Sequence, residues 1–147
     1  MSILHDIVAA TRDEIARRKK GTPLEMLQAR AESAPKPRSL QAALSSGFSI
    51  IGEVKAKSPS AGEMDQAKVH RAAKVYDNDD AISAISVITE PHFFAGSLER
   101  LSDVRSSTTK PILRKDFIID EYQVWEARGA WCRCGAFNGE PSRRPAV

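Results

Sequence analysis

Three short apolar runs along the chain alternate with longer segments in which apolar residues recur at helical spacing. The runs are typical of buried strands, and the longer segments are typical of amphipathic helices. The predicted strands span residues 48–55, 82–88 and 111–114. The predicted helices span residues 67–77, begin at Ser97, and run from Asp120 to about residue 128. Strands that alternate with helices in this way require right-handed crossovers and a parallel sheet, so the pattern predicts an α/β fold.

Residues 1–47 are predicted to form a helical extension that precedes the sheet. Apolar residues at positions 3, 4, 7, 8 and 15 recur at helical spacing, and Gly21 follows a basic last turn as the terminating residue. A second helix should then begin with Thr22 as its N-cap and with Glu25 closing a capping box. A short third helix is expected over residues 39–47.

Charged residues stand at the ends of the first and third predicted strands. The first strand continues into Glu53 and Lys55, and the third ends in Arg114 and Lys115. Burying a charge is costly, so these strand ends should open onto a site that uses the charge. In parallel α/β folds the active site lies at the carboxyl ends of the strands. Side chains alternate along a strand, so Glu53 and Lys55 share one face, whereas Arg114 points away from Lys115 and is expected in a peripheral ion pair.

The composition changes this picture little. The chain has 147 residues, of which 41% are hydrophobic and 28% charged, which is typical of one soluble globular domain. No apolar run approaches the roughly 20 residues that a membrane span needs, and the N-terminus lacks the layout of a secretory signal. A cytoplasmic location without a membrane partner is therefore the expectation.

Two smaller features carry weaker signals. The basic cluster at residues 17–20 has no interleaved aromatic residues, so a solvated helix end is a better interpretation than a nucleic-acid surface. Cys132 and Cys134 have no further cysteine or nearby histidine to complete a metal site, and we interpret them as free thiols. No metal, cofactor or nucleic-acid partner is predicted.

Three motifs lie in order at the predicted strand ends. They are E-x-K-x-K-S-P-S at 53–60, I-S-V-I-T-E at 85–90 with F-x-G-S at 94–97, and L-x-K-D-F-I-I-D-x-Y-Q at 113–123. Together they resemble the indole-3-glycerol phosphate synthase family over roughly residues 4–128. The resemblance implies a (β/α)8 TIM barrel and a carbon–carbon lyase of tryptophan biosynthesis. The substrate would be 1-(2-carboxyphenylamino)-1-deoxyribulose 5-phosphate, converted to indole-3-glycerol phosphate with release of carbon dioxide and water.

The resemblance also implies catalytic roles and a setting. Lys115 would be the general acid, a role open to a lysine whose pKa its neighbours tune. Lys55 would hold the substrate carboxylate, and Glu53 would form an ion pair with Lys55 or Lys115 and assist proton transfer. The family uses no cofactor, its partner is a small phosphorylated substrate, and its members are often monomeric or fused to a neighbouring pathway enzyme.

The substrate-binding residues come from the loops that follow the strands. Ser58 and Pro59 would shape the first loop over the substrate. Phe94 and Phe117 are predicted to line an apolar pocket for the anthranilate ring, although a place in the hydrophobic core is an equal alternative. Glu90 follows the second strand, where capping or ion pairing would explain it as well as catalysis does.

The pattern of the family stops after Arg128. Residues 129–147 show neither helical nor strand periodicity, and no fourth strand is predicted. A full barrel needs roughly 200 residues or more, so the chain is expected to be a partial barrel of about three βα units and a truncated product. Its activity is then expected to be impaired. The alternative is an inactive half-barrel that acts at most as an interaction module through its open strand edges.

Overall fold

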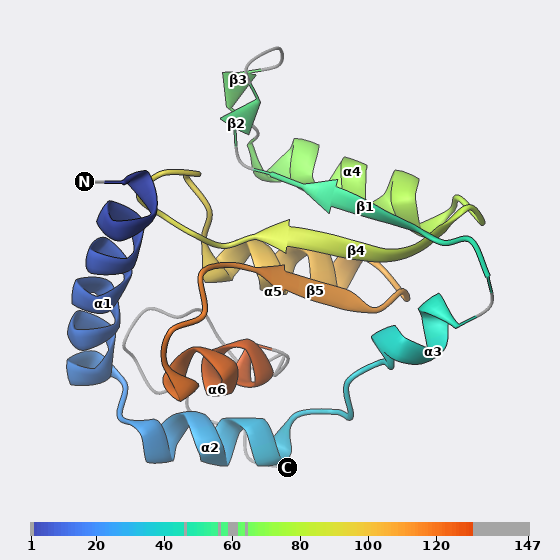
Figure 1. The fold of residues 1–147 in the computed structure, drawn as a ribbon. Coiled ribbons are helices and arrows are strands. Elements are labelled where there is room, and N and C mark those ends of the chain that lie inside the picture. Colours follow the sequence, from blue (N-terminus) through green and yellow to red (C-terminus); the bar gives the residue numbers. More distant parts are fainter. Residues whose placement is uncertain (1, 46, 56, 59–61, 64, 131–147) are drawn as a thin grey trace.

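The computed structural model describes residues 2–45, 47–55, 57–58, 62–63 and 65–130 (Figure 1). A three-stranded parallel sheet with the order β1–β4–β5 lies at its centre. The strands are β1 (Ile50–Val54), β4 (Ile82–Ile88) and β5 (Ile112–Lys115). The helices that follow them are α4 (Gln66–Asp77), α5 (Leu98–Ser107) and α6 (Glu121–Gly129). The predicted order of strands and helices and the parallel sheet are both confirmed.

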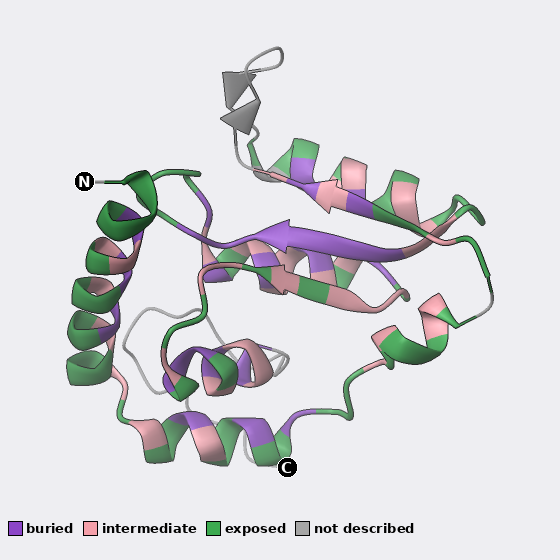
Figure 2. Ribbon diagram, viewed as in Figure 1, coloured by how far each residue is buried: buried purple, intermediate pink, exposed green. Residues whose placement is uncertain are grey.

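Side chains that point from the sheet toward α4 and α5 form the main hydrophobic core. Alternation places Val54, Ile85 and Val87 on that side, each no more than 1% exposed. The helix residues that meet them are Val69, Ala73, Leu98, Leu101 and Val104. Each such side chain contributes about 1.5–3 kcal/mol by leaving water. Figure 2 shows β4, the central strand, buried along most of its length.

The opposite face of the sheet is less covered within the described residues. Ile51 of β1 and Leu113 of β5 point to this face and are 38% and 39% exposed. On β4, Ser86 and Ile88 share the face but are buried. We call this side the inner face, because it would face the axis of a closed barrel.

The first strand is shorter than the sequence pattern predicts. β1 begins at Ile50 rather than at Phe48, whose side chain is 94% exposed. Beyond its end, β2 (Lys57–Ser58) and β3 (Gly62–Glu63) form a small antiparallel pair that the pattern did not predict.

Three helices precede the sheet, as predicted, but their ends differ from the prediction. They are α1 (Ile3–Gly21), α2 (Leu24–Ser33) and α3 (Leu40–Leu44). Gly21 lies inside α1, and Thr22 ends that helix by donating its backbone N–H to the Arg18 carbonyl. The predicted capping box at Thr22 is therefore wrong, and Pro23 is the N-cap of α2. The predicted N-cap of α3 is confirmed, since the Ser39 side chain accepts from the Ala42 N–H at 3.0 Å.

The helical extension packs against α6 and runs beside the carboxyl ends of the strands (Figure 1). A second small core joins Ile15 of α1, Leu27 of α2 and Tyr122 of α6. The Tyr122 hydroxyl also donates to the Thr22 carbonyl at 2.8 Å, which fixes the turn between α1 and α2. Among the described helices, none combines the length and the apolar character that crossing a membrane requires.

Candidate functional site

Glu53 and Lys115 meet on the inner face of the sheet. Glu53 comes from β1 and Lys115 from β5, and their Oε2 and Nζ atoms lie 2.7 Å apart. Strand β4 lies between them, so the two backbones are separated by two strand spacings, about 10 Å in total. Only long side chains that lean over β4 close this distance. The pair is solvated, with 57% of the Lys115 side chain and 35% of the Glu53 side chain exposed.

Close packing on the other side of β1 holds the backbone of Glu53. A Cβ atom at Gly52 would lie 2.8 Å from Cδ2 of Tyr76, so only glycine allows the ring of Tyr76 to pack there. The Tyr76 hydroxyl then donates to the Glu53 carbonyl at 3.3 Å. Helix α4 therefore sets the position from which the Glu53 carboxylate projects.

Lys55 lies at the same edge of the sheet as Lys115. It follows Val54, which pairs with Val87, and the next residue of β4, Ile88, pairs with Lys115. The register thus places Lys55, Ile88 and Lys115 in one row across the strand ends. Lys55 is half-buried and takes part in none of the ion pairs found among the described residues. Its ammonium is available to an anion at this edge.

The loop after β4 is built around the Glu90 carboxylate. Glu90 is 1% exposed and accepts hydrogen bonds from the backbone N–H groups of His92, Phe93 and Phe94 at 2.7–2.9 Å. At Gly96 a Cβ atom would lie 2.6 Å from the Ile88 carbonyl oxygen, so the loop needs glycine to return to the strand. These bonds favour the capping interpretation of Glu90, because the carboxylate is occupied by the loop that it shapes.

That loop presents Phe94 beside Phe117, which follows β5. The ring centroids lie 6.4 Å apart with an interplanar angle of 32°, within the range of favourable aromatic pairs. Phe94 is 45% exposed, and Phe117 is half-buried. The prediction that both rings line one pocket remains a prediction, but the structure brings the two rings together at the end of the sheet.

Arg114 points to the opposite face from Lys115, as alternation predicts. It forms ion pairs with Asp116 at 2.7 Å and with Glu126 at 3.3 Å. Only 5% of the Arg114 side chain and 1% of the Glu126 side chain are exposed. An ion pair was predicted correctly, but the prediction that it is peripheral is wrong. Burial raises the pKa of Glu126 above its ordinary value, although Arg18 and Arg114 favour the carboxylate.

The basic cluster of residues 17–20 binds α1 to the rest of the protein. Arg18 pairs with Glu126 at 3.0 Å, and Lys19 pairs with Asp120 at 2.7 Å. The hydrogen bond from Lys19 lowers the pKa of Asp120 below its ordinary value. The prediction of a merely solvated helix end is therefore wrong for these two residues, whose partners lie about a hundred positions away in the sequence.

Some predicted residues cannot be placed in the site. Ser58 belongs to β2, where it pairs with Gly62, but its side chain lies outside the described part of the chain. Pro59, Cys132 and Cys134 also lie outside the described residues. Their predicted roles remain predictions.

The sequence reasoning gave no role to Ser86, which lies between the two charged strands. Its Cα pairs with those of Glu53 and Leu113, so it stands in the row beneath Lys55 and Lys115. Its hydroxyl is buried and has no hydrogen-bond partner among the described residues. Since such a group normally finds a partner, it is suited to a bound molecule. The alternation along β4 placed it on the inner face, but nothing in the sequence marked it as unsatisfied.

A parallel β/α sheet with a carboxylate and two lysines at the carboxyl ends of its strands defines a class, the β/α enzymes with a site at that edge. A sequence profile described as indole-3-glycerol phosphate synthase matches residues 4–134. The chain belongs to this family of TIM-barrel carboxy-lyases of tryptophan biosynthesis. The match continues past Arg128, where the resemblance of the motifs ends.

Curated relatives give the same result. The indole-3-glycerol phosphate synthase of Campylobacter curvus is 42% identical over 131 residues, which cover 85% of this chain and 50% of the relative. That of Saccharopolyspora erythraea is 41% identical and is covered to 48% of its length by 87% of this chain. For Kineococcus radiotolerans the identity is 41%, with 89% of this chain and 50% of the relative covered. The chain thus spans about half the length of the curated relatives it matches.

Proposed function

We propose that the chain supplies one half of an indole-3-glycerol phosphate synthase active site. The proposed reaction closes the indole ring of 1-(2-carboxyphenylamino)-1-deoxyribulose 5-phosphate and releases carbon dioxide and water. The contact between Glu53 and Lys115, 2.7 Å long at the carboxyl ends of two strands, is the observation that carries the proposal. Family membership narrows the reaction to this one.

Lys115 is proposed as the general acid of ring closure. When the aromatic carbon attacks the ketone, negative charge develops on the ketone oxygen, and a proton must reach that oxygen. The Glu53 carboxylate favours the protonated ammonium of Lys115 before the reaction and accepts a hydrogen bond from it. The solvated inner face leaves room for a substrate to approach Lys115 from the side away from α4 and α5.

Lys55 is proposed to hold the carboxylate of the anthranilate moiety. It lies in the same row as Lys115 but outside the pair with Glu53, so its charge remains available for a second anion. Phe94 and Phe117 would then flank the aromatic ring at the end of the sheet, with their rings 6.4 Å apart. Ser58 and Pro59 are proposed to close the first loop over the substrate.

The test is to complete the site with the half of the Campylobacter curvus relative that this chain does not match. The two polypeptides are refolded together, and turnover is followed by indole fluorescence. We expect very little turnover by the chain alone and measurable turnover after assembly. In the assembled protein, Lys115→Met should lower turnover by about 10²- to 10⁴-fold, the range of general acid catalysis. The matched control is Lys74→Met, because Lys74 is an exposed lysine of α4.

The outcomes separate the parts of the proposal. A folded assembly that does not turn over the substrate would reject the proposed reaction. An active assembly in which Lys115→Met behaves as Lys74→Met would reject the role of Lys115. Strong turnover by the chain alone would show that it needs no second half.

A second candidate function is an interaction module. The exposure of Ile51 and Leu113, 38% and 39%, favours it, because apolar side chains on an open inner face would gain from a partner. Light scattering distinguishes the two candidates in the absence of any second half. A stable dimer that melts cooperatively would favour the module, and a monomer would favour the incomplete enzyme.

The proposed setting follows the family. The family acts on a phosphorylated small molecule. We further propose a cytoplasmic location, no nucleic-acid partner, and a complete protein that is monomeric or fused to a neighbouring pathway enzyme. Size-exclusion chromatography of the assembled protein tests the monomeric state.

A further inference from the structure

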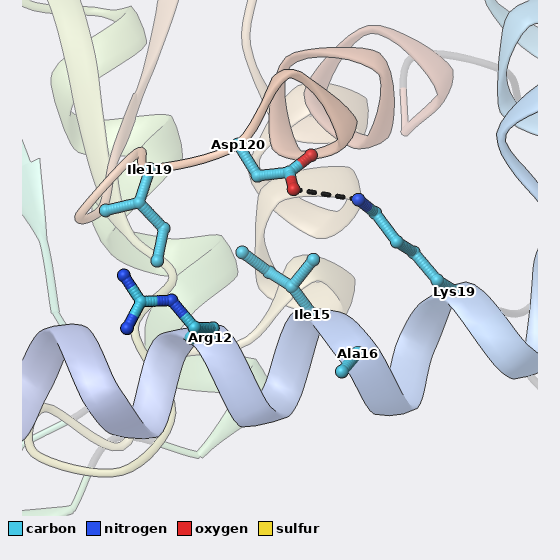
Figure 3. Close-up of a pocket in the computed structure, with 6 residues that line it drawn as sticks. All are labelled: Arg12, Ile15, Ala16, Lys19, Ile119 and Asp120. Atoms are coloured by element: carbon cyan, nitrogen blue, oxygen red, sulfur yellow. Dashed lines mark hydrogen bonds and ion pairs between the residues drawn. The ribbon is translucent and has the colours of Figure 1, made fainter.

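A pocket of about 260 Å³ lies between α1 and the loop that leads into α6 (Figure 3). Neither Glu53 nor the two lysines of the proposed active site line it. Its residues are Arg12, Ile15, Ala16, Lys19, Ile119 and Asp120. The four residues of α1 follow the spacing i, i+3, i+4 and i+7, so they lie on one face of the helix.

Both walls of this pocket are held in place by contacts of their own. The ion pair between Lys19 and Asp120, 2.7 Å long, ties α1 to the loop at one end of the pocket. Asp120 also caps α6 by accepting from the Tyr122 N–H at 2.8 Å. Buried Ile15 anchors the helix wall in the small core with Leu27 and Tyr122. The pocket is therefore formed before any ligand binds.

The charges of the pocket differ in their availability. Lys19 is engaged by Asp120, whereas Arg12 takes part in none of the hydrogen bonds or ion pairs found among the described residues. Figure 3 shows the Arg12 guanidinium beside Ile119, with Ile15 on the same side of the helix. The pocket thus offers one guanidinium against an apolar wall.

We propose that this pocket binds a small monocarboxylate with an apolar ring or branched body. The guanidinium of Arg12 would hold the carboxylate through two parallel N–H···O bonds, and the body would lie between Ile15 and Ile119. The volume is below the roughly 300–1,000 Å³ of sites for drug-sized molecules, so a single ring is the appropriate size. A phosphate dianion fits less well, because the second cation is neutralised and Asp120 would repel it.

The experiment uses the whole 147-residue chain labelled with ¹⁵N. Benzoate is titrated while the backbone amide resonances of Ile15, Ile119 and Asp120 are followed by NMR. Benzamide serves as the neutral ligand of the same shape, and inorganic phosphate as the anion without an apolar body. We expect saturable shifts with benzoate and dissociation constants at least about tenfold weaker for benzamide and phosphate, since a charge-assisted contact is lost or unsupported.

Two variants separate the charge from the shape. Arg12→Gln should weaken benzoate binding about tenfold and leave benzamide binding unchanged. Ala16→Leu keeps the guanidinium but extends a side chain into the pocket, so it should weaken both ligands. The control is Arg71→Gln, which removes an exposed arginine from α4. Equal loss of benzoate binding in the Arg12 and Arg71 variants, or equal binding of benzoate and benzamide by the unmodified chain, would overturn the proposal.

Discussion

Arg114 and Lys115 are neighbours on β5, yet their surroundings differ in almost every respect. Arg114 is 5% exposed and lies among Asp116, Glu126 and the Gln123 carbonyl, behind the sheet. Lys115 is 57% exposed and has Glu53 as its partner on the inner face. Alternation along one strand therefore sends one cation into a buried network and the other into a solvated site.

The difference teaches what each charge does for the protein. A buried ion pair must satisfy its partners, because removing one of them leaves an uncompensated charge away from water. A solvated pair such as that of Lys115 contributes little to stability, since water screens it. Charge that is not needed for folding is available for chemistry. We therefore assign stability to the Arg114 side of β5 and catalysis to the Lys115 side.

The largest expected effect on stability follows from removing Arg114. Arg114→Met leaves Glu126 with Arg18 as its only listed ion-pair partner among the described residues, in a place where the carboxylate is 1% exposed. We expect a loss of about 3–5 kcal/mol in the free energy of unfolding, measured by urea denaturation. A loss below about 1 kcal/mol, the range of solvated pairs, would remove the contrast between the two faces.

A second effect depends on pH and concerns Glu126 on the same buried side. Folding raises the pKa of this carboxyl, chiefly by burial, with Arg18 and Arg114 opposing the shift and Asp116 adding to it. Its contribution to stability is therefore complete below the ordinary glutamate value, about 4.3, and is lost as the pH rises through the raised folded value.

Glu126→Gln tests this sign. The free energy of unfolding of the unmodified protein minus that of the variant should fall as the pH rises through this window. Urea denaturation at a series of pH values measures it, with Glu121→Gln as the control on the same helix. A difference that grows with pH would mean that the ion pairs outweigh burial.

A smaller effect is expected from the more exposed pair that ties α1 to the loop before α6. Lys19→Gln should cost about 0.2–1 kcal/mol, and the cost should shrink at high salt. Because the hydrogen bond from Lys19 lowers the pKa of Asp120, the contribution is present above the ordinary aspartate pKa and is lost as the pH falls through the lowered folded value. Thermal melting at two salt concentrations and at acid pH checks this. A cost that salt does not change would indicate a buried contact.

The sequence was sufficient for the elements whose pattern is local. The order of strands and helices, the caps at Ser39 and Asp120, and the shared face of Glu53 and Lys55 all follow from spacing along a few residues. The contact of Glu53 with Lys115 was one of two alternatives, because spacing alone does not say which lysine the carboxylate reaches across β4.

The features that the sequence did not predict depend on contacts between distant segments. Arg18 looked like part of a solvated helix end because its partner Glu126 belongs to another helix. Thr22 has the side chain of an N-cap, but its backbone N–H ends α1 and its carbonyl accepts from Tyr122. The missing partner of the Ser86 hydroxyl is likewise a property of packing and has no signature in the local pattern.

The division of labour on β5 is tested by measuring two quantities on one variant, Lys115→Met. The account predicts that turnover by the assembled protein falls about a hundredfold or more, while the free energy of unfolding changes by less than about 1 kcal/mol. Unchanged turnover, or a loss of stability as large as that of Arg114→Met, would contradict it.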